Sequence, residues 1–183
     1  GKALRLIAAP FVLGLGFGVL LQGSQAQING DAAVLVAGHS GTGPGVKISG
    51  DLPPAPGPTP SVTGITVNLA GYTSGSTGLH LERTQIKASG FLMLESKGGA
   101  MLIQSSEVSN SGSNMTTLSA DAGSKIAIDS QSKLITTVAN APILLIADQM
   151  QLDGLVSAGT NAGITIRPRT LSRGITLGGA DES

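Results

Sequence analysis

The sequence predicts an all-β protein that folds as a parallel β-helix, with a hydrophobic, signal-like helix at its N-terminus. Three observations support this prediction. Short aliphatic segments recur throughout residues 61–179. Turns rich in Gly, Ser and Asn separate these segments, and no window of eleven residues shows a helical period. The clearest aliphatic segments also return at an interval of about 20 residues, which is the length of one turn of a β-solenoid.

The first 26 residues have the order of a secretory signal peptide. Lys2 and Arg5 form a short basic start, an apolar run covers residues 6–21, and small polar residues lead to Ala26. We therefore predict cleavage between Ala26 and Gln27. The alternative is a membrane anchor that is retained, although sixteen residues give a helix of only roughly 24 Å, short of the ~30 Å hydrocarbon core.

Two further segments precede the repeats. Residues 27–50 are predicted to be a short β-rich segment, with strands at Ala32–Ala37 and Val46–Ile48. Residues 51–60 contain five prolines in ten positions and are predicted to be an extended linker, since proline cannot donate a backbone hydrogen bond.

Residues 61–183 are predicted to form the solenoid. Five segments alternate apolar and polar residues, as strands with one buried face do: Ile65–Leu69, Leu79–Leu81, Ile126–Ile128, Ile164–Ile166 and Ile175–Leu177. Three segments are continuously apolar and are predicted to be more fully buried strands: Phe91–Leu94, Ala100–Ile103 and Ile143–Ile146. An antiparallel β-sandwich is the alternative, but an aromatic content of 2% favours a thin aliphatic core over a wide one.

Composition limits the classes of function. Eleven basic residues balance eleven acidic ones, so no basic field exists to bind nucleic acid. The chain has no cysteine, which excludes disulfides, zinc–thiolate sites and a cysteine nucleophile. No cofactor and no metal site are expected.

Two aspartates are the candidates for catalysis. Asp129 and Asp148 are 19 residues apart, so a turn of that length would stack them one strand spacing apart, about 4.8 Å. That separation is close to the ~5–5.5 Å of the acid pair in retaining glycosidases. Each aspartate also directly follows an apolar strand, where Asp is an ordinary turn former.

The remaining charged and histidine residues favour surface roles. His80 alternates with leucines and is expected on the outer face of a strand. His39 lies beside Ser40 in a Gly-rich segment, but no Gly-x-Ser-x-Gly motif accompanies them. The basic cluster of Arg167, Arg169 and Arg173 is predicted to be a solvated edge that opposes aggregation.

The C-terminal part of the chain resembles the repeat region of large bacterial exoproteins of the filamentous-haemagglutinin family, which are exported by two-partner or autotransporter routes. The residues that carry the resemblance are Asn140–Asp148, Leu155–Thr160, Ile164–Pro168 and Arg173–Asp181. The resemblance implies a right-handed parallel β-helix, a surface or extracellular location, and a role in adhesion. Because such repeats normally continue, it also implies that the solenoid of residues 61–183 is cut short at its C-terminus.

The sequence therefore predicts a non-enzymatic, secreted or cell-surface β-solenoid that acts in adhesion or as a scaffold. Its expected partners are glycans or proteins on host or neighbouring cells, together with an outer-membrane secretion partner. Contact with a membrane is expected only through residues 1–26 if they are retained. The alternative is a polysaccharide lyase or glycoside hydrolase on the same fold, with Asp129 and Asp148 as its acid pair.

Overall fold

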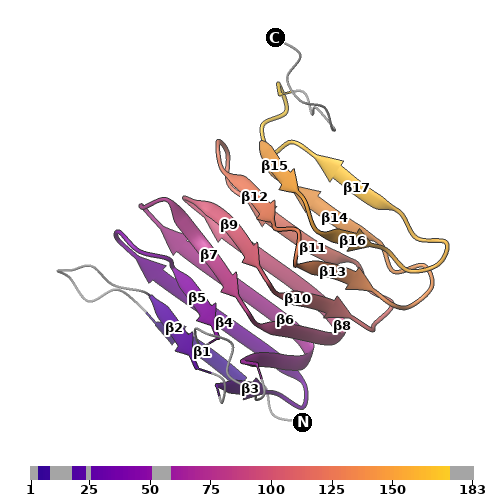
Figure 1. The fold of residues 1–183 in the computed structure, drawn as a ribbon, viewed down its shortest axis with the longest axis horizontal. Coiled ribbons are helices and arrows are strands. Elements are labelled where there is room, and N and C mark those ends of the chain that lie inside the picture. Colours follow the sequence, from indigo (N-terminus) through magenta and orange to yellow (C-terminus); the bar gives the residue numbers. More distant parts are fainter. Residues whose placement is uncertain (1–3, 9–17, 24–25, 51–58, 174–183) are drawn as a thin grey trace.

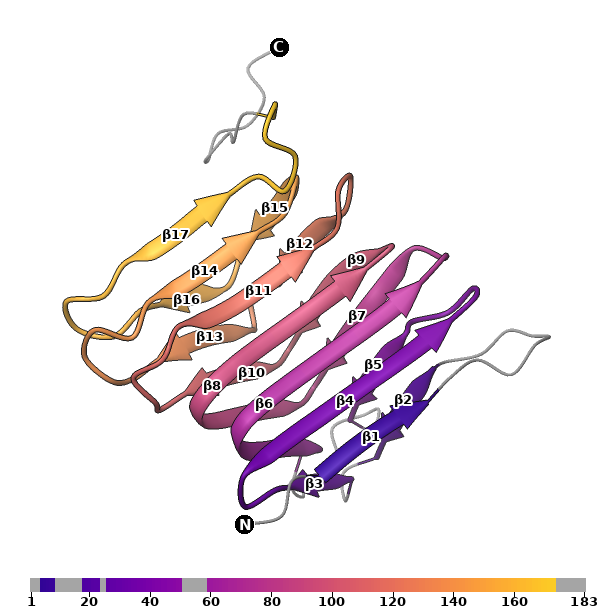
Figure 2. The ribbon, with the colours of Figure 1, turned by 180° about the vertical axis from the view of Figure 1, so that it is seen from behind.

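The chain winds into a β-solenoid with three strands in each turn. The computed structural model describes residues 4–8, 18–23, 26–50 and 59–173, and they contain no helix. All strand pairings in it are parallel. Successive turns lie side by side along one axis, from the N-terminal to the C-terminal end (Figure 1 and Figure 2). The predicted parallel β-helix is confirmed, and the antiparallel sandwich is wrong.

The strands lie on three faces, which we call first, second and third in chain order. The first face contains β1 (Leu4–Ala8), β4 (Ala33–Ser40), the C-terminal parts of β6 (Ser61–Thr73) and β8 (Gln85–Lys97), β11 (Thr116–Ala120), β14 (Ile143–Ile146) and β17 (Ile164–Arg167). The second face is a separate six-stranded sheet of β2 (Val19–Gln22), β5 (Val46–Ser49), β7 (Thr77–Glu82), β9 (Ala100–Gln104), β12 (Lys125–Ile128) and β15 (Gln149–Leu152). The third face contains β3 (Gln27–Asn29), the N-terminal parts of β6 and β8, β10 (Glu107–Asn110), β13 (Lys133–Thr136) and β16 (Leu155–Ser157).

The first and third faces join into one eleven-stranded sheet because β6 and β8 are long enough to belong to both. Each has thirteen residues and continues from the third face onto the first. The pairing register between them shifts between Gly64 and Thr66, where β6 changes face. A β-bulge of this kind bends a strand without ending it.

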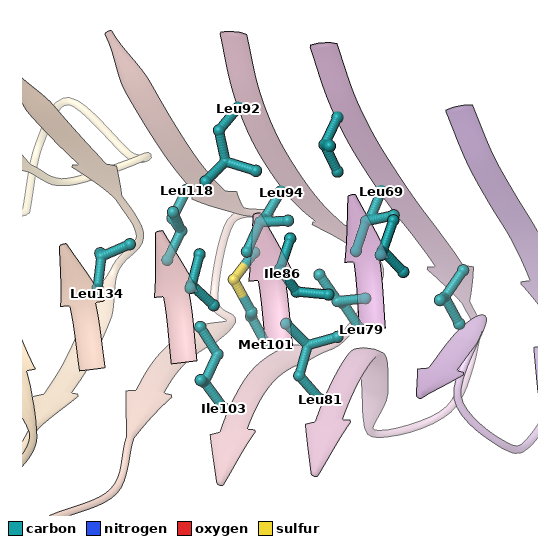
Figure 3. Packing of buried hydrophobic residues seen from close by; sticks show 14 of the residues in the cluster. Leu69, Leu79, Leu81, Ile86, Leu92, Leu94, Met101, Ile103, Leu118 and Leu134 are labelled. Atoms are coloured by element: carbon teal, nitrogen blue, oxygen red, sulfur yellow. The ribbon is translucent and has the colours of Figure 1, made fainter. Parts of the chain in front are cut away.

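Aliphatic side chains from all three faces fill one narrow core (Figure 3). Leu69, Leu94, Leu118 and Leu145 hold equivalent positions in successive first-face strands, and all four are fully buried. Period-two alternation continues through the segments that we predicted to be more fully buried strands. In β8, for example, Leu92 and Leu94 point inward while Met93 is only half-buried.

The turns of the solenoid are longer than the spacing of the aliphatic segments predicts. On the second face, Ile126 pairs with Met101 in the turn before it and with Met150 in the turn after it. The shorter turn was predicted from the spacing of the aliphatic segments that contain Ile126, Leu144 and Ile164. The first two of these segments lie on different faces, because Ile126 belongs to β12 and Leu144 belongs to β14. Only the last two are neighbours in the same sheet, with Ile143 paired to Ile164.

The expected N-terminal helix is not found in the described residues. Leu4–Ala8 and Val19–Gln22 are strands instead, and they pair with β4 and β5 to make the first turn of the solenoid. The segment is rich in glycine, which is a poor helix former, and in aliphatic residues, whose side chains pack well in sheets. Residues 1–3, 9–17 and 24–25 lie outside the described residues. Within the described part of the chain, no helix is long and apolar enough to cross a membrane.

The solenoid also begins before residue 61. The strands of residues 27–50 continue the same sheets, since β4 pairs with β6 and β5 pairs with β7. Most of the predicted proline-rich linker, residues 51–58, lies outside the described residues, as does the predicted strand Ile175–Leu177. The last residue of the linker, Pro60, is part of the solenoid: its carbonyl oxygen accepts hydrogen bonds from Thr84 Oγ1 at 2.7 Å and from the Gln85 amide at 3.0 Å.

Candidate functional site

The polar side chains that sequence reasoning singled out lie mainly at the corners of the solenoid. We call the bend between the first and second faces the first corner, and the bend between the second and third faces the second corner. The bend that returns the chain to the first face of the next turn is the third corner.

Asp129 lies at the second corner, immediately after β12. Its two carboxylate oxygens accept the backbone N–H of Ser105, in the preceding turn, at 3.0 and 3.1 Å. The same carboxylate accepts the Gln131 amide at 3.2 Å and the Ser132 hydroxyl at 2.6 Å. Asp129 therefore fastens its own turn to the one before it.

Asp148 lies at the first corner, between β14 and β15, and connects three turns. It accepts the backbone N–H of Gly123, in the preceding turn, at 2.7 Å. It also accepts both the amide and the hydroxyl of Thr170, in the following turn, each at 2.7 Å. The hydrogen bond from Gly123 is the largest cause that lowers the pKa of Asp148 to about 2, followed by those from Thr170, and the nearby charge of Arg173 acts in the same direction.

The two aspartates do not form the predicted stacked pair. Lys125 pairs with Gln149 and Ile128 pairs with Leu152, so Asp148 precedes the second-face strand of its turn while Asp129 follows that of its own. Asp148 is therefore level with Ser124, five residues before Asp129. Five steps of ~3.3 Å put the two side chains about 16 Å apart along the face. The prediction failed because it assumed a turn that is too short.

A different carboxylate is the neighbour of Asp129. Asp153 follows β15 at the same corner, one turn further on, and its amide donates to the Ile128 carbonyl at 2.9 Å. Asp129 and Asp153 line one shallow depression of about 270 Å³, together with Gln104, Lys125 and Gln151. The Asp153 carboxylate accepts the Gln151 side-chain amide at 2.7 Å.

The two histidines lie on outer surfaces, as expected for His80. Its Nε2 is 2.7 Å from Gln104 Oε1 in the next turn, and burial lowers its pKa. His39 belongs to β4 and not to a loop, and it is exposed. The neighbouring Ser40 is buried, because successive strand residues point to opposite faces, so β4 does not bring the two together as a catalytic pair.

The arginine cluster faces the aspartates of the first corner. Arg169 Nη2 lies 3.7 Å from an Asp121 carboxylate oxygen, and Asp121 also accepts the Gly98 amide at 3.0 Å. Arg169 contacts Asp121, and the positive charge of Arg173 lowers the pKa of Asp148. At least two of the three arginines therefore interact with carboxylates of the solenoid itself.

Sequence reasoning missed an outer row of aromatic and charged residues at the first corner. His39, Tyr72 and Lys97 are register neighbours in β4, β6 and β8. The rings of His39 and Tyr72 are 6.3 Å apart between centroids, and Lys97 Nζ lies 5.1 Å from the Tyr72 centroid, in the range of a cation–π contact. These residues come from three successive turns, so only the correct turn length could have brought them together.

Buried polar residues inside the corners were also missed. Thr84, Ser106 and Ser132 occupy successive turns of the second corner: the amide of Thr84 donates to Ser106 Oγ, and that of Ser106 to Ser132 Oγ, both at 3.1 Å. At the third corner Asn110 is fully buried. Its side-chain amide donates to the Gly90 carbonyl and to Thr116 Oγ1, each at 3.1 Å, while its Oδ1 accepts the Gly112 amide at 2.9 Å.

The described residues contain no group of three or more His, Asp or Glu side chains placed to hold a metal ion. Searches of family models, of curated proteins and of solved structures gave no match to this chain.

Proposed function

We propose that this chain is a non-enzymatic β-solenoid segment of a secreted or cell-surface exoprotein similar to the filamentous-haemagglutinin adhesins, and that it acts in adhesion or as a surface scaffold. The observation that carries the proposal is the use of the acidic residues. Asp129 and Asp148, the strongest candidates for catalysis, accept three or more hydrogen bonds each from their own and neighbouring turns. Such contacts fasten turns together, as an elongated scaffold requires.

The outer surface supports binding over an extended area. It consists of short rows of side chains repeated along parallel strands, and the second-corner depression is shallow and lacks aromatic residues. Each row contributes a few polar contacts. A partner, either a glycan or a protein on another cell, would bind through many weak contacts along the solenoid.

Binding to cells tests the adhesion proposal. The full chain, labelled with a fluorophore, is titrated onto epithelial and bacterial cells and onto a glycan array. The proposal expects saturable binding, with single substitutions in the His39, Tyr72 and Lys97 row each weakening it by only about twofold, since exposed contacts contribute little individually. Absence of binding to all of these surfaces would contradict adhesion and leave only the scaffold role.

Location is tested by fractionation and by mass spectrometry of the N-terminus. We propose export, with cleavage between Ala26 and Gln27, and the detection of secreted protein that starts at Gln27 would support both. Cleavage there removes β1 and β2 and leaves β3, β4 and β5 as the first strands of the three faces. A chain recovered only from inside cells, with residues 1–26 retained, would contradict both parts.

The enzyme alternative is tested with Asp129→Asn and Asp148→Asn. Purified chain is incubated with a panel of acidic and neutral polysaccharides, and new reducing ends and unsaturated sugars are measured. The proposal expects no cleavage by the unmodified chain. Polysaccharide cleavage by the unmodified chain would contradict the proposal if Asp129→Asn abolished it without changing the circular dichroism spectrum. The chain would then be a carbohydrate-active enzyme.

A further inference from the structure

The outer surface of the first face carries two rows of side chains that include no charged residue in the strands β4 to β17. Each row consists of register neighbours, which point to the same side of the sheet. The first row contains Ala33, Thr66, Phe91 and Met115. The second row contains Leu35, Asn68, Met93, Thr117, Leu144 and Thr165. We call them the uncharged rows, and the strands that carry them lie side by side in Figure 2.

Large apolar side chains are exposed at the centre of this surface. Met115 is 40% exposed, and Ile65, whose side chain lies close to Gly90, is 51% exposed. Phe91 and Met93 are half-buried beside them. The second and third faces instead carry charged side chains at outward positions of β5, β10 and β13. An exposed apolar patch of this kind is typical of a surface that binds another protein.

Opposite charges border the uncharged rows at the first corner. Lys97 ends β8, and Asp121, which follows β11, is its equivalent in the next turn because Ser96 pairs with Ala120. The side chains of Lys97 and Asp121 are 41% and 38% exposed. Two copies of the chain placed face to face would use both charges if each Lys97 met Asp121 of the other copy.

One two-fold axis produces this match. It lies in the contact plane, parallel to the strands and midway between β8 and β11, so that β8 of each copy faces β11 of the other. Phe91 then faces Met115, and Met93 faces Thr117, so the uncharged rows of the two copies meet. Because β6 faces β14 and β4 faces β17, all six strands of this face from β4 to β17 have an opposing strand.

Other positions of the axis fit less well. An axis through β8 would place Lys97 against Lys97 and Glu95 against Glu95, and like charges in contact repel each other. An axis through β11 would bring the two Asp121 carboxylates together. An axis between β6 and β8 would leave β17 without an opposing strand.

The area of this contact fits a reversible dimer. Six strands at ~4.8 Å cover about 29 Å, and the outward positions from Phe91 to Lys97 cover about 20 Å along the strands. The contact would bury roughly 580 Å² on each copy, or about 1,200 Å² in total, which is the lower limit for specific, stable interfaces. We therefore expect dissociation constants in the micromolar range.

We propose that the outer surface of the first face binds a second copy of this chain, in a two-fold dimer whose sheets pack face to face. Aligned sheets pack about 10 Å apart, so the side chains of the uncharged rows interdigitate at the centre. Lys97 and Asp121 form ion pairs between the copies at the border. The dimer gives the solenoid a second molecule in addition to any partner on another cell.

Sedimentation equilibrium of the full chain at rising protein concentration measures the dimer. Met115→Lys should raise the dissociation constant at least about tenfold, because the contact would bury an unpaired charge. Thr117→Lys, a second outward position in the uncharged rows, should act in the same way. Leu20→Lys is the matched control: Leu20 is also exposed, at 43%, but it belongs to the second face, so the dissociation constant should not change.

Three results would overturn the proposal. The first is an unmodified chain that stays monomeric up to about 1 mM. The second is a dimer that Met115→Lys and Thr117→Lys leave intact, which would assign the contact to another surface. The third is a monomeric chain whose binding to cells Met115→Lys abolishes, which would assign the uncharged rows to a different partner.

Chemical cross-linking tests the position of the axis, because the chain has no cysteine of its own. In the proposed dimer, Leu35 in β4 faces Thr165 in β17 of the other copy. A short bismaleimide should therefore cross-link a mixture of Leu35→Cys and Thr165→Cys chains. Either variant alone should stay uncross-linked, since its two cysteines would lie five strand spacings, or roughly 24 Å, apart. Equal cross-linking in the single-variant samples would contradict the proposed dimer.

Discussion

At the corners, single side chains bind the backbone of neighbouring turns. Asp148 accepts hydrogen bonds from Gly123 in the turn before it and from Thr170 in the turn after it. Asn110 has a similar role inside the third corner, where its side chain makes hydrogen bonds to Gly90, Gly112 and Thr116. The corner bends are thus fixed by named contacts as well as by the sheets.

The lowered pKa of Asp148 predicts a dependence of stability on pH. Its folded pKa of about 2 lies below the ordinary value of 3.8, so the ionised form is the one that the folded state favours. Its contribution is fully present above about pH 5, and it is lost as the pH falls through 3.8 toward 2. Amide NMR signals of Gly123 and Thr170, followed from pH 5 to pH 1.5, should shift together with a midpoint near 2.

Substitution provides the control for this prediction. Asp148→Asn should weaken hydrogen-exchange protection at Gly123 and Thr170 at neutral pH and should abolish the acid transition of both signals. Asp153→Asn is the matched control, because in the described residues Asp153 accepts only the side chain of Gln151 through its carboxylate. An acid midpoint near 4, or an equal effect of Asp153→Asn, would contradict the assignment.

Asn110→Ala is predicted to destabilise the fold. It leaves the buried Gly112 amide without its acceptor and removes the donor to the Gly90 carbonyl and to Thr116 Oγ1. Loss of partners for buried polar groups costs about 1–3 kcal/mol. Urea unfolding measures this loss, and Ser109→Ala, an outer-face change in the same strand, should cost less than about 0.5 kcal/mol. Equal midpoints for the two variants would show that the Asn110 contacts are not stabilising.

The sequence predicts which residues form the corners, but it does not predict their hydrogen-bond partners. Asp129 and Asp148 are recognisable as turn formers, because each follows an apolar strand. Their partners cannot be predicted without the turn length, since Ser105 is 24 residues from Asp129 and Gly123 is 25 residues from Asp148. Burial of Asn110 was missed because a segment rich in Ser, Asn and Gly predicts an exposed turn.

At the scale of the strand, alternation decides which side chains stabilise the solenoid. Leu118 of β11 points into the core and is fully buried, whereas Leu144, in the adjacent β14, points outward and is only half-buried. Leu118→Ala should therefore destabilise the fold by about 2–5 kcal/mol, which includes the cost of a cavity. Leu144→Ala should cost about 1 kcal/mol or less.

Thermal and urea unfolding of both variants measure the difference. The unmodified chain and Leu145→Ala, which removes the inward neighbour of Leu144, complete the series. Leu145→Ala should resemble Leu118→Ala, since both side chains belong to the same buried row. A larger loss for Leu144→Ala than for Leu145→Ala would mean that the strand has the opposite face inward.

Strong aliphatic segments made most first-face and second-face strands predictable. β7, β9, β12 and β14 each contain at least two apolar residues that sequence patterns detect. The third-face strands were harder, because β10 reads Glu-Val-Ser-Asn and has a single apolar residue. The first-turn strands were missed for a different reason: their glycine-rich, uniformly apolar sequence has the order of a signal peptide, which local pattern alone does not distinguish from a buried strand.

At the scale of the molecule, the solenoid compensates for the absence of large side chains by repeating small contacts. The chain has an aromatic content of 2% and no cysteine, yet one continuous aliphatic cluster extends from Val19 to Ala147. Parallel pairing along all three faces adds a ladder of backbone hydrogen bonds to each turn. Composition and alternation are sufficient to predict this architecture, whereas the register requires the structure.

Successive turns of the solenoid stack in parallel, in the register given above. The most direct test is a set of nuclear Overhauser contacts between backbone protons of neighbouring strands in isotope-labelled protein. We expect contacts from Ile126 to Met101 and to Met150, and from Leu118 to Leu94 and to Leu145, in the pattern of parallel strands. Close Hα–Hα contacts between consecutive strands, which arise from antiparallel hairpins, would contradict it.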